Sequence, residues 1–102
     1  MKKIYISGKI SGLPIESVVD KFARNAEFLM VKGFEPVNPI DVSPYHVSKT
    51  WEDYMRYDIS ALMKCDAIYM LNDWGQSRGA RIEYVIAKEL GLEIIFEGEF
   101  NQ

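Results

Sequence analysis

The chain has 102 residues and a formal net charge of −3, and 48% of its residues are hydrophobic. A chain of this length and apolar content is expected to form one small domain, residues 1–102, with its own core. The charges are scattered without a basic stripe, which argues against a nucleic-acid polymer or a membrane surface as the partner.

Three further features of the composition bear on the class of protein. The single cysteine, Cys65, excludes an internal disulfide and is expected to be a buried, reduced thiol. One histidine, His46, and one cysteine argue against a zinc site. No apolar stretch reaches the length of a transmembrane helix, and the apolar part of the N-terminus is too short for a signal peptide, so we expect a cytoplasmic protein.

The first half of the chain reads as strand, helix and strand. Residues 2–8 (KKIYISG) are rich in β-branched and aromatic side chains and end in glycine, which predicts a strand. After a turn, residues 15–33 place apolar side chains at the spacing of one helix face, and Gly33 is a natural end for that helix. Residues 34–39 are predicted to be a short strand and residues 40–50 a loop.

The second half repeats the alternation. Thr50 is a plausible N-cap for a helix over residues 51–65, and residues 66–72 form an apolar strand predicted to be buried on both faces. A loop, a helix over residues 80–90 ended by Gly91, and a last strand follow. Strands that alternate with helices predict an α/β fold, a three-layer α/β/α sandwich of the Rossmann or flavodoxin type whose parallel sheet has four to five strands.

Ligands of such a sheet bind at the carboxyl ends of its strands, which nominates the loops 8–14, 38–50 and 72–79. The first loop offers backbone N–H groups that suit an anion such as phosphate, from Gly8, Lys9, Ile10, Ser11 and Gly12. In the third loop, Ser77 and Gly79 stand at the start of a helix. Taken alone, the first loop reads rather as an ordinary tight turn and Ser77 as an N-cap, but two such loops at one sheet edge favour a phosphate site more than either does singly.

Glu83 is a carboxylate inside the helix of the stretch SRGARIEYVIAKELG. Ile82, Ile86 and Leu90 form the predicted apolar row, and Glu83 lies beside it. Near the helix start, its ionised carboxylate could attack an anomeric carbon and form a covalent glycosyl intermediate. The alternative is a solvent-exposed glutamate paired with an arginine.

Asp58 is a second candidate, in the middle of the preceding helix. It could act as a proton donor or hold a leaving group, or it could be a surface residue paired with Arg56 or Lys64. Tyr5, at the end of the first strand, could present its hydroxyl to the same pocket, or it could be a core aromatic residue with a solvated tip. Four aromatic residues near the loops could stack on a nucleobase or fill the core: Trp51, Tyr54, Tyr69 and Trp74.

Three segments in this order carry a family resemblance: IYISGKISG, DISALMKCDAIYML and SRGARIEYVIAKELG. The chain resembles the nucleoside 2-deoxyribosyltransferase-like superfamily, especially its small domains of unknown function of the DUF4406 type. These are related to the 2'-deoxynucleoside 5'-phosphate N-hydrolases. The resemblance implies cleavage of the N-glycosidic bond, or base exchange, on 2'-deoxynucleoside 5'-monophosphates. It implies no cofactor and no metal, a small-molecule nucleotide as partner, and a homodimer or higher homo-oligomer.

The resemblance also implies roles for single residues. Glu83 matches the family nucleophile, Asp58 the catalytic aspartate eight residues before Asp66, and Tyr5 the N-terminal catalytic tyrosine. Ser77, six residues before Glu83, matches the serine that binds the 5'-phosphate in the hydrolases, and the loop 8–12 matches the phosphate-side loop. Lys9 departs from the small residue, proline or serine common in the family. A non-catalytic module that senses or sequesters a nucleotide in the same pocket is the alternative function.

Overall fold

The computed structural model describes residues 1–44 and 46–101. Its sheet has four parallel strands in the order β2-β1-β3-β4, which confirms the predicted α/β fold and strand number. The strands are β1 (Lys3–Ser7), β2 (Glu35–Val37), β3 (Ala67–Met70) and β4 (Glu93–Phe96). The helices are α1 (Ile15–Val31), α2 (Pro39–Val42), α3 (Trp51–Leu62) and α4 (Arg78–Leu90), with 3-10 turns η1 (Trp74–Gln76) and η2 (Glu99–Asn101).

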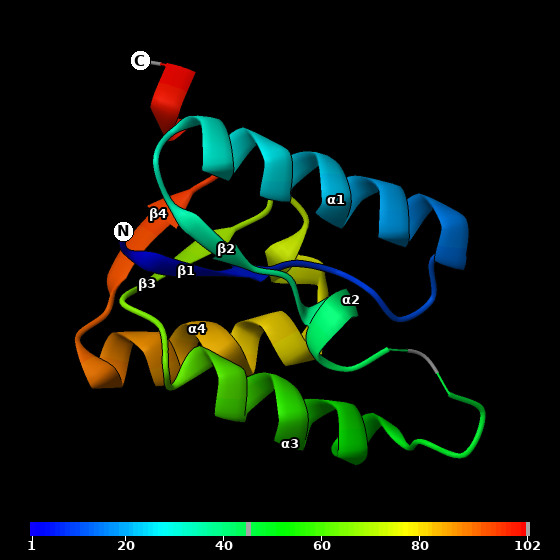
Figure 1. Cartoon of the computed structure of the whole chain (residues 1–102). Helices are drawn as coiled ribbons and strands as arrows, with labels where there is room; N and C mark the ends of the chain where they lie inside the picture. The colour runs from blue at the N-terminus through cyan, green and yellow to red at the C-terminus, as the bar shows by residue number, and fades with distance from the viewer. Residues whose placement is uncertain (45, 102) are drawn as a thin grey trace.

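The layers follow from the direction in which the chain winds. From β1 the chain crosses to β2 on one side, and from β3 it crosses to β4 on the other. Because parallel crossovers are right-handed, this reversal puts the helices on opposite faces of the sheet. Figure 1 shows α1 over one face and α3 with α4 over the other. Among the described residues, no helix is both long enough and apolar enough to cross a membrane.

The alternation of side chains along β1 directs its residues to two different layers. Ile4 and Ile6 belong to the core beneath α1, whereas Tyr5 packs in the second core, between the sheet and α3 and α4. Successive side chains of a strand point to opposite faces, so Ser7 shares the face of Tyr5. All residues of β3 are buried, as predicted, because both faces of this central strand are covered.

The predicted helix ends are confirmed at two places. Thr50 and Asp53 form a capping box at the start of α3, with reciprocal hydrogen bonds of 3.2 and 2.9 Å. Gly91 ends α4 in the left-handed conformation, with φ of 74°.

The loop predicted over residues 40–50 is wrong at its beginning, because the short helix α2 starts at Pro39. The Asn38 side chain caps this helix by accepting a hydrogen bond of 3.0 Å from the Ile40 N–H group. Asparagine as N-cap followed by proline at the first helical position is a recognised start signal. The helix has only four residues, so it carries no apolar periodicity to accompany that signal.

Gly8 lies where the end of β1 packs against Leu71, and a methyl group there would stand 2.7 Å from Leu71 Cδ1 and 2.9 Å from its Cβ. Because Leu71 Cβ cannot rotate away, Gly8→Ala should lower the free energy of unfolding by about 1–3 kcal/mol. Denaturant unfolding measures this change. The matched control is Gly75→Ala, since a Cβ at Gly75 meets no described atom within 4 Å; equal stability losses in both variants would contradict the steric explanation.

Candidate active site

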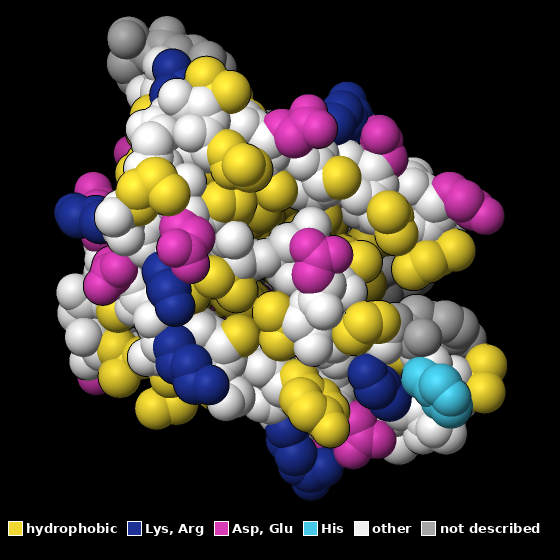
Figure 2. All heavy atoms as spheres, in the orientation of Figure 1, with side chains coloured by type: hydrophobic (Ala, Val, Ile, Leu, Met, Phe, Trp, Pro, Cys, Tyr) yellow, Lys and Arg dark blue, Asp and Glu magenta, His cyan; other side chains and the backbone are white. Residues whose placement is uncertain are grey.

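A cavity of about 610 Å³ opens at the carboxyl ends of β1 and β3, where the winding of the sheet reverses. This is the position at which open α/β sheets bind ligands. The three nominated loops all contribute to its walls. Of the residues predicted for the site, every one except Lys9 lines the cavity. Figure 2 shows hydrophobic side chains exposed over the start of α1, where Leu13, Ile15 and Val19 form part of the cavity rim.

Glu83 is buried at the floor of the cavity, with 5% of its surface exposed. Both of its carboxylate oxygens accept hydrogen bonds from β1. The Tyr5 hydroxyl donates to Oε2 over 2.8 Å, and the Ser7 hydroxyl donates to Oε1 over 2.7 Å. Two donors at two oxygens hold the carboxylate in one orientation facing the end of the sheet.

The inner face of α4 differs from the predicted one. Ala80, Glu83 and Ala87 are its buried residues, whereas Leu90, expected in the apolar row, is 46% exposed. The interpretation of Glu83 as solvent-exposed is therefore wrong. The small side chains at the two alanine positions let α4 approach the sheet closely enough for Glu83 to reach the hydroxyl groups of β1.

The environment of Glu83 shifts its titration. Burial raises the pKa of Glu83 to about 7, and the hydrogen bonds from Ser7 and Tyr5 lower it only in part. The pKa of the Tyr5 hydroxyl is raised well above its usual value, first by burial and then by the nearby charges of Glu83 and Asp58. Tyr5 therefore stays protonated and remains a donor to Glu83 at neutral pH.

Asp58 lies on the inner side of α3, in the buried row formed with Met55 and Leu62. It is 6% exposed and lines the cavity, and its Oδ1 atom has no hydrogen-bond partner among the described residues. Burial first, and the charge of Glu83 second, raise the pKa of Asp58 to about 7. The interpretation as a surface ion pair is wrong, since Arg56 instead pairs with Asp53.

The two carboxyl groups therefore share one pocket with different surroundings. Glu83 is held by two hydroxyl donors that favour its ionised form, whereas no described group stabilises the inner oxygen of Asp58. Near pH 7 the pair is expected to hold one proton, with Asp58 protonated and Glu83 ionised. Such a division into one acid and one ionised carboxylate is the arrangement that glycosyl-transfer chemistry needs.

Ser77 and Gly79 line the cavity at the start of α4. The Ser77 Oγ atom accepts a hydrogen bond of 3.1 Å from the Ala80 N–H group, which confirms its role as N-cap. A methyl group at Gly79 would lie 3.1 Å from the Met55 Sδ atom, so the absence of a side chain lets α3 and α4 pack closely here. The β1–α1 loop also lines the cavity, through Gly8, Ile10, Ser11 and Gly12.

Two of the four aromatic candidates lie at the cavity and two do not. Trp51 and Tyr54 line it, and the Arg78 guanidinium stacks over the Trp51 ring at 4.5 Å. Tyr69 packs in the core beneath α1, and Trp74 stacks on Tyr84 against the second core. Among the described residues no lysine or arginine lines the cavity, so the charged side chains in its wall are Asp58 and Glu83.

Ser7 is the site residue that the sequence analysis missed. Its hydroxyl is fully buried, and it bonds Glu83 as closely as Tyr5 does. One signal was present: Ser7 is a polar residue two positions after Tyr5 in an apolar strand, so both must face the same layer. The prediction for Cys65 is confirmed, since its thiol is buried, and burial raises the pKa of this thiol to about 11.

Comparisons with known proteins identify the family and the fold of the chain. The family model described as "Domain of unknown function (DUF4406)" matches residues 2–96. A search of curated proteins finds no match. Among solved structures, the chain is similar to a 2-desoxiribosyltransferase from Leishmania mexicana, with a TM-score of 0.71, 20% identity, and coverage of 94% of this chain and 63% of the other.

A second similar structure is the Clostridium botulinum CMP N-glycosidase BcmB, with a TM-score of 0.61 and 21% identity. This comparison covers 99% of the present chain and 75% of the other. At these identities the likeness shows a shared fold. The shared fold is the one that the resemblance to the nucleoside 2-deoxyribosyltransferase-like superfamily implied. The present chain spans 63% of the length of the Leishmania protein.

Glu83→Gln should stabilise the protein in a way that depends on pH. The unfolded chain loses the Glu83 proton near the ordinary pKa of 4.5, whereas the folded chain holds it to about 7. The wild type therefore loses stability as the pH rises between these values, and the glutamine variant does not. We expect the variant to gain about 2 kcal/mol in free energy of unfolding above pH 7 and little below pH 4.5.

Denaturant unfolding at a series of pH values measures this difference. The matched control is Glu89→Gln, a change at an exposed position of the same helix. A stability gain for Glu83→Gln that is constant from pH 4 to pH 8 would show that ionisation of this carboxyl is not opposed by burial.

Proposed function

The chain belongs to the family described as a domain of unknown function, DUF4406, and we propose that it cleaves or exchanges the N-glycosidic bond of 2'-deoxynucleoside 5'-monophosphates with Glu83 as nucleophile. The observation that carries this proposal is the buried Glu83 carboxylate, held by Tyr5 and Ser7 in the same cavity as Asp58. The names of the two similar structures, a deoxyribosyltransferase and an N-glycosidase, support the same bond as the point of attack.

In the first step, a carboxylate oxygen of Glu83 attacks C1' of the sugar. The bond between C1' and the base nitrogen breaks, and its electron pair leaves with the base. Asp58, protonated near neutral pH, donates its proton to the base, which departs uncharged. The product is a glycosyl ester on Glu83, and the Tyr5 and Ser7 hydroxyls keep the carboxylate oriented during the attack.

In the second step, water attacks C1' of the ester. Asp58, now ionised, accepts the proton of the water, the bond between C1' and Glu83 breaks, and 2-deoxyribose 5-phosphate is released. If a second base takes the place of water, the same step gives a new nucleotide. Carboxyl groups, hydroxyl groups and water supply every atom and proton, so the proposed steps use no cofactor.

The walls of the cavity suit the two ends of such a substrate. Trp51 and Tyr54 offer aromatic faces against which a base can pack, on the side of Asp58. The loop 8–12 offers backbone N–H groups other than that of Lys9, which bonds Asp73, and the Ser77 hydroxyl stands at the start of α4. We assign the 5'-phosphate to this second end, with the Lys9 ammonium group as the nearby cation.

Incubation of the protein with each deoxynucleoside 5'-monophosphate, followed by chromatography, should reveal free base. Glu83→Gln should lower the rate at least a thousandfold, because it removes the nucleophile. Asp58→Asn should lower it about a hundredfold, because it removes the proton donor. Circular dichroism checks that each variant is folded.

The outcomes separate the two candidate functions. Base release that persists in Glu83→Gln would contradict the proposed nucleophile. Tight binding of a monophosphate with no base released by the wild type would favour the non-catalytic nucleotide-binding module.

Ser7→Ala should alter the pH profile of base release. The Ser7 hydrogen bond lowers the pKa of Glu83, so its loss raises that pKa and moves the acidic limb of the profile to higher pH. The maximal rate should fall about ten- to a hundredfold, because one of the two donors to the carboxylate is lost. Ser60→Ala, at an exposed position of α3, is the control. An unchanged acidic limb in Ser7→Ala would contradict the role of Ser7.

A further inference from the structure

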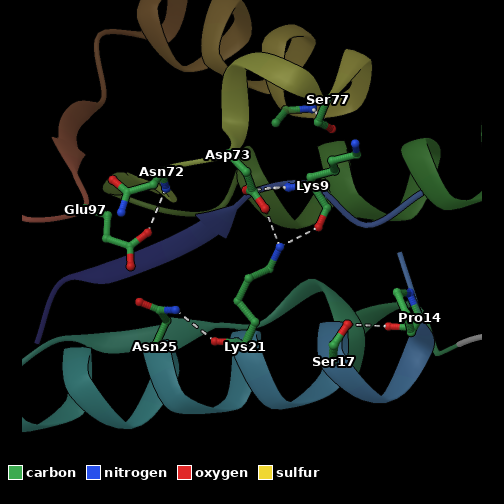
Figure 3. Close-up of polar contacts among 10 residues, drawn as sticks. Lys9, Pro14, Ser17, Lys21, Asn25, Asn72, Asp73, Ser77 and Glu97 are labelled. Atoms are coloured by element: carbon green, nitrogen blue, oxygen red, sulfur yellow. Dashed lines mark hydrogen bonds and ion pairs between the residues drawn. The ribbon is translucent and has the colours of Figure 1, made fainter. Parts of the chain in front are cut away.

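A partly buried ion pair lies beside the cavity, and neither of its members lines the cavity wall. The Lys21 Nζ atom of α1 is 2.6 Å from Oδ2 of Asp73, in the loop that follows β3. The same Nζ atom donates to the Lys9 carbonyl oxygen over 2.8 Å, and the Lys9 N–H group donates to Asp73 Oδ1 over 3.0 Å. Figure 3 shows these three contacts, which are referred to below as the Lys21–Asp73 bridge.

The bridge engages both backbone polar groups of Lys9. It thereby connects three segments that are distant in the sequence: the β1–α1 loop, helix α1 and the β3–α4 loop. The Lys9 side chain remains outside the bridge. In Figure 3 it extends away from Lys21, on the side where Ser77 lies. Fixing the Lys9 backbone therefore also fixes the point from which the Lys9 side chain extends.

The β1–α1 loop has little internal support. Among the described residues, one backbone hydrogen bond joins two members of the segment 8–13, from the Leu13 N–H group to the Ile10 carbonyl oxygen, and it is long, at 3.4 Å. Gly12 adopts φ of 84°, a conformation open to few other residues. The position of the loop therefore depends on groups outside it, and the bridge supplies them.

The ion pair is more protected than the other ion pairs of the described chain. The side chains of Lys21 and Asp73 are 24% and 27% exposed, whereas those of Arg24 and Asp20 on the same face of the sheet are 72% and 63% exposed. Partial burial opposes the charge of Asp73, but the hydrogen bonds from Lys21 and the Lys9 N–H group lower its pKa below the usual value. The bridge is therefore ionised at neutral pH and screened less by salt than a surface pair.

We propose that Lys21 and Asp73 are positioning residues that hold the loop 8–12 in the geometry that binds the 5'-phosphate. The inference rests on the proposed function, in which this loop and Ser77 receive the phosphate. Asp73 lies four residues before Ser77 in the same loop, so the bridge links the two walls of the phosphate subsite. Neither Lys21 nor Asp73 lines the cavity, and both act through Lys9.

The change Asp73→Asn distinguishes a positioning role of the bridge from a purely electrostatic one, because the two predict opposite changes in phosphate affinity. Asp73→Asn removes a negative charge and releases the Lys21 ammonium group, so electrostatics alone would strengthen the binding of a phosphate. Loss of the bridge would instead loosen the loop and weaken binding. Because asparagine has nearly the size of aspartate, this variant separates the two effects without a change in volume.

The test is calorimetric titration of inorganic phosphate and of a deoxynucleoside monophosphate into the full chain. We expect Asp73→Asn and Lys21→Met to weaken phosphate binding about tenfold, and Lys21→Arg to retain most of the affinity. Asp20→Asn is the matched control, since Asp20 forms an exposed ion pair with Arg24 on the same helix and should leave binding unchanged. Equal or tighter binding by Asp73→Asn, or no phosphate binding by the wild type, would overturn the proposal.

A second measurement follows the loop itself. Amide hydrogen exchange at Lys9 should become at least tenfold faster in Asp73→Asn, while exchange in the centre of β3 stays slow and shows that the fold is intact. In kinetic assays, the variant should raise KM for monophosphates about tenfold with little change in kcat. If the wild type releases no base from any nucleotide, the proposed function fails, but phosphate titration and Lys9 exchange still decide the role of the bridge.

Discussion

The hydrogen bonds from Tyr5 and Ser7 to the Glu83 carboxylate are the interaction on which the site depends. They join the end of β1 to the first turns of α4. They also hold a carboxyl group between the sheet and the helix, among side chains that are otherwise mostly apolar. A buried carboxylate is costly unless donors engage it, and here both of its oxygens are engaged. The same two contacts orient the carboxylate toward the cavity, so the feature that makes its burial tolerable also supports its proposed role as nucleophile.

The second carboxyl group of the cavity, that of Asp58, is buried without such donors among the described residues. Asp58 faces the same cavity, but no described group bonds its inner oxygen, and burial together with the charge of Glu83 raises its pKa to about 7. The two acids therefore share one pocket but differ in the donors that engage them. Keeping both carboxyl groups buried at neutral pH costs stability, because burial raises the pKa of each to about 7. The apolar cores on the two faces of the sheet provide the support for this arrangement.

Much of this molecule could be predicted from its sequence, and the exceptions have physical reasons. The strands and long helices follow from apolar periodicity, and the ends of α3 and α4 follow from Thr50 and Gly91. The four-residue helix α2 was missed, because a helix of one turn has caps but no period. The inner face of α4 was misplaced toward Ile82, Ile86 and Leu90, because hydrophobicity favours these positions. In the structure, close packing of α4 on the sheet selects Ala80, Glu83 and Ala87 instead.

The sequence by itself determined the order and type of the elements, the parallel sheet, and the edge at which the polar loops gather, because these depend on local preference and on the handedness of crossovers. Only the tertiary structure decided which carboxylates are buried and which groups hold them. Glu83 and its donor Tyr5 are 78 positions apart, and Lys21 and Asp73 are 52 positions apart. Burial and hydrogen bonding between such distant residues exist only after the chain has folded, so no local pattern in the sequence can encode them alone.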